Sequence, residues 1–318
     1  MSSKAQNSVP EINRLVIVGL GLIGSSLAIA AREQGLAKTV IGISRRTSTL
    51  ELALELGVID RACESLESLA SELDFGDLVV IGVPTLSVPS VIAVCHDFLS
   101  DRVTITDVAS VKGSVVKAVL DIYGNLPVQF VPGHPIAGSE KSGVEAANSQ
   151  LFKDHRVILT PHNTADCEHL KLVSAVWSSV GAVVSTMSVD EHDSILAATS
   201  HLPHFLAYSL VDTLASVGDN REIFRYAAGG FRDFTRIAAS DPVMWRDIAL
   251  ANREPILSIL DQVMNNFQML RGAIDKGDQD YLMDVFTRAR DDRNHFGKLL
   301  EKKTLKGQMT EKTIDCRS

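Results

Sequence analysis

The chain has little that would suit a secreted or a nucleic-acid-binding protein. Its four cysteines, Cys63, Cys95, Cys167 and Cys316, lie far apart and show no C-x-x-C spacing. This favours reduced thiols in a cytoplasmic protein over a disulfide framework. Basic residues are in the minority, with 31 Lys and Arg against 39 Asp and Glu and a net charge of -8. We therefore expect no nucleic-acid partner and no binding to an anionic membrane surface.

Long hydrophobic runs are also scarce. The uncharged stretch over residues 15–31 is shorter than the ~20 apolar residues that a membrane span needs. It follows a mostly polar segment and holds three glycines at a fixed spacing, which an export signal does not need. We therefore interpret it as part of a folded domain, and no membrane association is expected.

That stretch contains an apolar β-type run, then Gly19, Gly21 and Gly24 at G-x-G-x-x-G spacing, then a helical pattern. This order is typical of a dinucleotide-binding turn. The first glycine allows the tight turn, the second lets the backbone approach a pyrophosphate, and the third lets helix and strand pack closely. Leu22 and Ile23 begin the helix, whose free N–H groups face the phosphates. The pattern predicts the cofactor class but not the reaction.

The length of 318 residues favours two domains. The first, residues 14–187, alternates short β-branched runs with helical patterns. This alternation predicts an α/β domain, a Rossmann-type doubly wound and mostly parallel sheet with helices on both faces. The predicted strands are residues 15–18, 40–43, 78–82, 103–106, 128–131, 157–159 and 182–186.

The second domain, residues 188–300, shows almost no strand signal. Apolar stripes at helical spacing predict an all-helical domain. The stripes are too apolar on one face to stand alone, which favours packing against the first domain and a homodimer. The stripes cover residues 190–216, 241–272 and 280–300, and polar or charged segments at 1–13 and 301–318 are expected to form a loose arm and tail.

The segment after the second predicted strand indicates which nicotinamide cofactor is bound. In the usual NAD version of this fold, an acid at this place binds the ribose 2′-hydroxyl. Here Ser44 and Arg45 follow the strand, Thr49 comes soon after, and no acid is present. A hydroxyl and a guanidinium can hold a 2′-phosphate. NADP is therefore favoured, with NAD and a merely solvated arginine pair as the alternatives.

Three strand ends carry unusual loops, and ligands of such sheets bind beyond the carboxyl ends of the strands. Val83 and Pro84 form a tight turn after the predicted strand 78–82, which can pass close to a nicotinamide. Ser110 and Lys112 place a hydroxyl and a cation at the rim. His134 stands on a loop stiffened by proline and glycine, and a neutral imidazole can take a proton from a hydroxyl as hydride leaves the same carbon.

The helical part contributes two further clusters. His201 and His204 lie three residues apart and could share one helical face, but no third ligand completes a metal site, so none is expected. In the second cluster Arg232 and Arg236 flank Asp233 beside a Gly-Gly pair. Such a cluster is either a solvated salt bridge or a fork for a substrate carboxylate.

Five motifs in order resemble the prephenate and arogenate dehydrogenases, the cyclohexadienyl dehydrogenases of tyrosine biosynthesis. The resemblance covers about residues 14–300 and implies oxidative decarboxylation. In that reaction a hydride passes from ring C4 to the nicotinamide while the ring carboxylate leaves as carbon dioxide. The motifs span residues 19–24, 107–112, 133–138, 200–204 and 230–236.

The resemblance also implies roles for individual residues. His134 is the base on the C4 hydroxyl, and Ser110 bonds both His134 and that hydroxyl. Arg236 binds a substrate carboxylate, with Asp233 and Glu140 in its ionic network. The resemblance places His204, Ser240 and Trp245 in the substrate pocket, assigns Ser44, Arg45 and Thr49 to an NADP-selecting version of the family, and assigns the dimer contact to the helical domain. Tyrosine as a competitive inhibitor stays an open expectation.

Two rival functions remain. A hydroxyacid or imine-type dehydrogenase with the same plan would carry a lysine or another acid or base on the first helix of the second domain, and residues 190–200 lack any lysine. A non-catalytic NADP-sensing protein would have no need for His134 and Arg236 together. The sequence does not distinguish prephenate from arogenate, which differ by a keto and an amino group.

Overall fold

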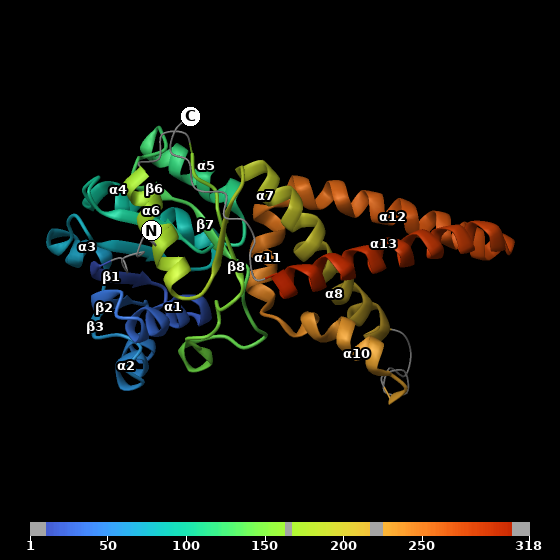
Figure 1. Cartoon of the computed structure of the whole chain (residues 1–318), viewed down its shortest axis with the longest axis horizontal. Helices are drawn as coiled ribbons and strands as arrows, with labels where there is room; N and C mark the ends of the chain where they lie inside the picture. Colours follow the sequence, from blue (N-terminus) through green and yellow to red (C-terminus); the bar gives the residue numbers. More distant parts are fainter. Residues whose placement is uncertain (1–10, 163–166, 217–224, 307–318) are drawn as a thin grey trace, which may run out of the picture. The chain divides into compact units, whose positions relative to one another are not determined.

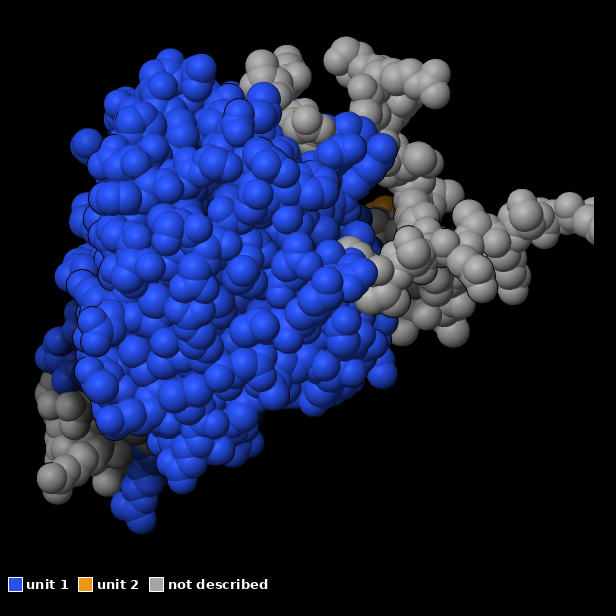
Figure 2. All heavy atoms as spheres, turned by 90° about the vertical axis from the view of Figure 1, so that its left-hand side faces the viewer, with its two compact units in different colours: residues 1–255 blue, residues 256–318 orange. Residues whose placement is uncertain are grey.

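The computed structural model describes residues 11–162, 167–216 and 225–306 (Figure 1). It forms two compact units, residues 1–255 and residues 256–318. Figure 2 shows one face of the first unit, in blue. The boundary expected near residue 187 falls inside the first unit and stays a prediction.

The first unit is built on a six-stranded parallel sheet in the order β3-β2-β1-β4-β5-β6. This order places the ends of β1 and β4 side by side where the chain reverses its direction of winding, which is where such sheets bind ligands. The predicted fold class is confirmed. The strands are β1 (Ile12–Val18), β2 (Ala37–Ile43), β3 (Arg61–Cys63), β4 (Leu78–Ile81), β5 (Thr104–Asp107) and β6 (Phe130–Val131).

Helices cover the sheet because its central strands are apolar on both faces. Val16, Val79 and Ile105 point to one face, where they join a core with side chains of α3, α4 and α5. On the other side α1 contacts β1 and β2, and α6 contacts β6. The helical segments are α1 (Leu22–Glu33), α2 (Thr47–Glu55), α3 (Leu66–Leu69), η1 (Ala70–Glu72), η2 (Thr85–Ser87), α4 (Val88–Phe98), α5 (Lys112–Tyr123) and α6 (Cys167–Ser179).

The sheet prediction needs two corrections. The short β3 was missed, because three residues are too few to show a period. The predicted strands near 157 and 182 do not join the main sheet. They form a second sheet as β8 (Arg156–Leu159) and β9 (Val183–Thr186), with β7 (Gly133–Pro135) antiparallel to β8. The chain leaves the main sheet at Pro132, which has no N–H to continue a ladder.

The helices that follow are α7 (Val189–Leu196), a π-helical turn η4 (Ala197–His201), α8 (Leu202–Ala215), α10 (Gly229–Thr235), η5 (Arg236–Ala239) and α11 (Pro242–Ala251). The expected helix 190–216 therefore contains a widened turn. Pro203 cannot donate to the carbonyl of Thr199, and π turns accommodate such interruptions. The expected helix 241–272 is broken at Asn252, whose side chain bonds the backbone oxygen of Asp193 instead.

The second unit consists of α12 (Arg253–Lys276), from Ile256 onward, and α13 (Gln279–Lys306). Helix α13 continues beyond residue 300, where the helical domain was expected to end. Many large apolar side chains of these helices are exposed in the single chain, among them Met264, Phe267, Met283 and Phe286. No helix of the described residues is both long and apolar enough to cross a bilayer.

The expectation of reduced thiols holds for some of the cysteines only. Cys63 and Cys95 are free, and burial raises the pKa of the Cys95 thiol to about 12. Cys167 is disulfide-bonded, so the expectation is wrong there. Cys316 lies outside the described residues, as do most of the expected arm and tail.

The three glycines in the turn after β1 differ in how closely other atoms surround them. A Cβ on Gly24 would lie 2.4 Å from the carbonyl oxygen of Gly19 and 2.8 Å from the Cγ2 of Ile17. Gly19 has a φ of +103°, and its Cβ would lie 2.6 Å from the carbonyl oxygen of Gly82. A Cβ on Gly21 would meet nothing within 4 Å. Gly19 and Gly24 are therefore required by packing, whereas Gly21 faces open space.

These contacts predict different effects for alanine at Gly24 and at Gly21. Gly24→Ala should lower the free energy of unfolding in urea by ~1–3 kcal/mol, because α1 must move away from β1. Gly21→Ala should stay within about 0.5 kcal/mol of the wild type and weaken dinucleotide binding, measured by fluorescence titration. A Gly24→Ala variant as stable as the wild type would contradict the packing argument.

Candidate active site

The turn after β1 can hold a dinucleotide. Helix α1 follows Gly21 without a side-chain cap, so the N–H groups of Leu22, Ile23 and Gly24 have no partner within the helix. The open space beside Gly21 lies where a phosphate would approach them. Val83 and Pro84 follow β4, the neighbour of β1. This geometry fits a nicotinamide dinucleotide across the ends of β1 and β4.

The residues predicted to contact a 2′-phosphate lie together after β2. Arg45 and Arg46 are exposed, and neither guanidinium forms an ion pair with any residue the structure describes. The Ser44 hydroxyl accepts a bond from the N–H of Arg46 at 3.3 Å. Helix α2, which includes Thr49, also begins without a side-chain cap. This end of β2 therefore offers hydroxyl and guanidinium donors and no carboxylate.

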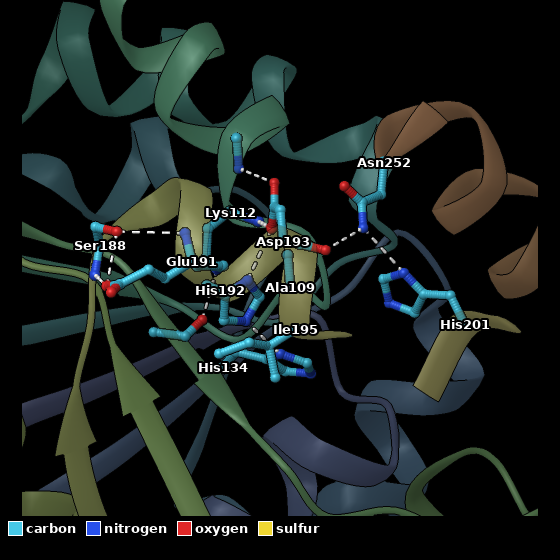
Figure 3. Close-up of polar contacts among 12 residues, drawn as sticks. Ala109, Lys112, His134, Ser188, Glu191, His192, Asp193, Ile195, His201 and Asn252 are labelled. Carbon is cyan, nitrogen blue, oxygen red and sulfur yellow. Dashed lines mark hydrogen bonds and ion pairs between the residues drawn. The ribbon is translucent and has the colours of Figure 1, made fainter. Parts of the chain in front are cut away.

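The predicted base, His134, lies in β7 and is buried. Its Nδ1 is 2.9 Å from Nε2 of His192, and the two rings meet edge-on with centroids 5.1 Å apart. Nδ1 of His192 is in turn 2.7 Å from Oδ1 of Asp193. Figure 3 shows the three side chains in this order, His134 from β7 and the other two from α7. Only Nε2 of His134 is left to meet a substrate.

Asp193 also binds the start of α5. Its Oδ1 accepts the N–H of Lys112 at 2.9 Å and its Oδ2 accepts the N–H of Gly113 at 2.8 Å. Burial disfavours the charged carboxylate, but the bonds from His192 and from these two N–H groups outweigh it and lower the pKa of Asp193. The side chain is therefore an ionised acceptor that caps α5 from another helix.

Lys112, expected at the rim, is instead fully buried. Its ammonium donates to the carboxylate of Asp107 and, at 2.6 Å, to the carbonyl oxygen of Gly133. Oδ1 of Asp107 accepts the N–H of Gly133 at 3.2 Å. Burial lowers the pKa of Lys112, and the charge of Asp107 opposes that shift. The pair fixes the backbone next to His134 and is not a free cation for a ligand.

The electrostatics around His134 favour a neutral imidazole. Burial is the main cause of a pKa well below the ordinary value, and His192, Lys112 and His201 lower it further. Ser110 is half-buried, and its hydroxyl has no hydrogen-bond partner among the described residues. The hydrogen bond that His134 makes here is to His192, so a contact with Ser110 stays a prediction.

Two predicted pocket residues are brought together on the helices. The rings of His204 and Trp245 stack with centroids 3.7 Å apart and planes inclined by 22°. Nδ1 of His204 donates to the carbonyl oxygen of Ser200 at 2.8 Å, and burial lowers the pKa of His204. The indole N–H of Trp245 is buried without a partner among the described residues. Such an N–H costs ~1–3 kcal/mol unless something accepts it.

The remaining predicted residues lie around this stack. Arg236 forms an ion pair with Glu140, which links η5 to the loop after β7. The carbonyl oxygen of Ser240 accepts the Tyr208 hydroxyl at 2.7 Å. Asp233 is exposed, and no ion pair joins it to Arg236 in the described parts of the chain. The predicted ionic network is therefore seen for Glu140 and Arg236 but not for Asp233.

The possible metal pair does not form. His201 bonds Asn252 at 3.0 Å, whereas His204 stacks on Trp245. Over the residues described, no group of three His, Cys, Asp or Glu side chains is placed to hold a metal ion.

The sequence reasoning missed His192, Asp193 and Asn252. The first two form an imidazole and a carboxylate in adjacent positions of a helix that buries both. Two adjacent buried polar residues in one helix turn are uncommon, but burial is decided by tertiary packing, so the sequence alone carried no signal for this pair. Asn252 was missed for the same reason, because its partners are 51 and 59 residues away.

Comparison with known proteins gives a consistent result. Residues 27–186 match the prephenate dehydrogenase nucleotide-binding domain and residues 188–288 the prephenate dehydrogenase dimerization domain. Cyclohexadienyl dehydrogenase of Zymomonas mobilis is 38% identical over 86% of this chain and 92% of its own. Prephenate dehydrogenase of Bacillus subtilis is 38% identical over 88% and 75%.

Solved structures agree. The prephenate dehydrogenase of A. aeolicus in complex with hydroxyphenyl propionate and NAD+ superposes with a TM-score of 0.82 and 36% identity, covering 90% of this chain and 98% of that one. Synechocystis arogenate dehydrogenase gives 0.73 and 28%, covering 89% and 99%. With the dinucleotide turn, the buried imidazole and the Arg236–Glu140 pair already in place, these matches show that the chain belongs to the prephenate dehydrogenase family.

Proposed function

We propose that the protein is an NADP-preferring enzyme that oxidatively decarboxylates prephenate, arogenate or both. The buried, neutral His134, with one nitrogen free at the carboxyl edge of the sheet, carries this proposal. The A. aeolicus relative was solved with NAD+ and a hydroxyphenyl acid, and the Synechocystis relative is named for arogenate. Both substrates therefore stay within the proposal.

In the proposed reaction, the turn after β1 would hold a nicotinamide cofactor, which would supply the hydride acceptor for ring C4. The bond from ring C1 to its carboxylate breaks, its electron pair enters the ring and carbon dioxide leaves. Nε2 of His134 takes up the proton of the C4 hydroxyl as positive charge develops at that carbon, and returns it to the phenol oxygen. No proton is gained or lost overall. Ser110 is proposed to bond the same hydroxyl.

The residues proposed to bind the substrate lie mostly on the helices that follow β9. Arg236 is proposed to bind the side-chain carboxylate, with Glu140 orienting the guanidinium and Asp233 joining when substrate is bound. The unpartnered indole N–H of Trp245 and the free nitrogen of His204 would bond the polar groups of the ring substrate. Ser240 is proposed to line the same pocket. Tyrosine, which is the product from arogenate and resembles the product from prephenate, would compete for these residues.

Four broader assignments remain proposals. The preference for NADP rests on Ser44, Arg45 and Thr49 beside the uncapped end of α2. A homodimer is supported by the exposed apolar side chains of the second unit, since such patches mark interfaces, and by the match to a dimerization domain. Residues 14–187 and 188–300 are the proposed domains, and the cytoplasm is the proposed location.

The function is tested by mixing the purified protein with NADP or NAD and with prephenate or arogenate, following the absorbance of the reduced cofactor. We expect turnover with NADP and at least one substrate, with release of one carbon dioxide per hydride. An absence of turnover with all four pairs would reject the proposal and leave the two rival functions.

His134→Asn should lower kcat by ~10²–10⁴, the range for a lost general base. Cofactor affinity should stay unchanged, because His134 lies outside the dinucleotide turn. Stopped-flow single turnovers and a cofactor titration on the same sample check both parts. His169→Gln is the matched control, since it removes another buried imidazole, bonded to Thr104 at the start of β5, and should leave kcat as it is.

Arg45→Ala should raise the Kd for NADP by ~10-fold or more, since a charge-assisted bond to phosphate contributes about 1.5–3 kcal/mol. The Kd for NAD should change little. Isothermal titration with both cofactors measures the ratio, and Arg32→Ala, at an arginine paired with Asp60 instead, serves as the control. Equal losses for NADP and NAD would show that Arg45 does not read the 2′-phosphate.

A further inference from the structure

We propose that Asp193, acting through His192, decides which nitrogen of His134 carries the proton and so prepares Nε2 as the base. The two side chains are positioning residues for the reaction proposed above, on which this inference rests. They touch neither substrate nor cofactor in the proposed mechanism. Hydrogen bonds connect Asp193 to His192 and His192 to His134 (Figure 3).

The direction of the hydrogen bonds starts at Asp193. An ionised carboxylate can only accept, and Asp193 is held ionised by the donors around it, which include the N–H groups of Lys112 and Gly113. Nδ1 of His192, 2.7 Å from Oδ1, must therefore carry a proton. In a neutral ring this leaves Nε2 of His192 with a lone pair.

The same logic applies to the next contact. Nε2 of His192 can only accept, so Nδ1 of His134, 2.9 Å away, must donate. In a neutral His134 the other nitrogen, Nε2, then has the lone pair. The opposite tautomer would place two lone pairs against each other at hydrogen-bond distance. The hydrogen bonds among Asp193, His192 and His134 therefore favour the one neutral tautomer of His134 that can accept a proton at its free nitrogen.

The surroundings keep the ring of His134 neutral before reaction. Its partner His192 is fully buried. Burial is the main cause that lowers the pKa of His134, and His192, the Lys112 ammonium and His201 lower it further. Asp193 contributes a negative charge on the other side of His192. When the substrate proton reaches Nε2, this carboxylate partly offsets the charge on His134 until the proton returns to the product oxygen.

The packing around Asp193 is consistent with a fixed position. A Cβ on Gly113 would lie 2.7 Å from Oδ2 of Asp193, so only glycine admits the carboxylate there. On the other side, the Asn252 amide donates to the backbone oxygen of Asp193 at 2.9 Å. The carboxylate is thus held from α5, and the backbone of Asp193 is held from the break between α11 and α12. Together these bonds fix the position from which Asp193 reaches His192.

Two substitutions at His192 separate positioning from simple packing. His192→Gln can still accept from His134 through its oxygen and donate to Asp193 through its amide, so it keeps the direction of the bonds. His192→Phe fills the space without either group. We expect the Phe variant to lose ~10²-fold or more in kcat with little change in KM, as wrong-tautomer enzymes do. The Gln variant should recover most of that loss.

The tautomer itself is measured without substrate. In protein labelled with ¹⁵N-histidine, two-dimensional NMR at pH 8 should show protonated Nδ1 and unprotonated Nε2 for His134 in the wild type and in His192→Gln. In His192→Phe, and in Asp193→Asn, the signal should shift towards protonated Nε2. The His134→Asn variant assigns the resonances, and thermal unfolding confirms that each variant is folded.

The outcomes are distinguishable. If His134 keeps protonated Nδ1 in His192→Phe, or if His192→Gln is no more active than His192→Phe, the inference is wrong. If Asp193→Asn changes neither the tautomer nor kcat, Asp193 has no part in it. If the wild type turns over neither prephenate nor arogenate, the proposed function fails, while the NMR spectra still decide whether the tautomer is selected.

Discussion

The carboxylate of Asp193 is the interaction on which the geometry of this site depends. It caps α5, which follows β5 of the main sheet, and it bonds His192 on its own helix α7. One charged group thereby joins a helix of the sheet to the helices that carry the proposed substrate-binding residues. Because the group is buried, its charge is costly, and three donors offset that cost. Any shift of α7 relative to α5 would therefore leave buried groups unpaired.

A second buried charge, on Lys112, fixes the strand that carries His134. The Lys112 ammonium, between Asp107 and the carbonyl oxygen of Gly133, ties the end of β5 to the strand that carries His134. Removing one member of such a pair leaves the other charge buried and unpaired, which commonly lowers stability by ~3–5 kcal/mol. Lys112 thus contributes its backbone N–H to Asp193 and its side chain to the His134 strand. His134, the proposed base, is thereby positioned from two sides, by the Lys112–Asp107 pair and by His192.

Particular residues show how far the sequence could be interpreted. The glycine turn was recognisable because its demands are local: Gly19 needs a positive φ and Gly24 close packing within a few residues. His134 was recognisable because proline and glycine surround it at a strand end. Lys112 was placed at the rim because sequence shows that a cation follows β5 but not that Asp107 lies opposite it inside the protein. The second sheet was missed for the same kind of reason, since β7 pairs with β8 across more than twenty residues.

The sequence by itself determined the α/β class, the dinucleotide turn, the family and the candidate base, because each depends on residue types at short spacings. Only the tertiary structure decided how that base is oriented. His134 and His192, joined by one hydrogen bond, are 58 residues apart in the sequence, and Lys112 and Asp193, joined by another, are 81 residues apart. The direction of a hydrogen bond depends on which groups meet in space. Local sequence patterns depend on the conformation that the backbone must adopt, whereas buried polar networks form only when distant elements pack together.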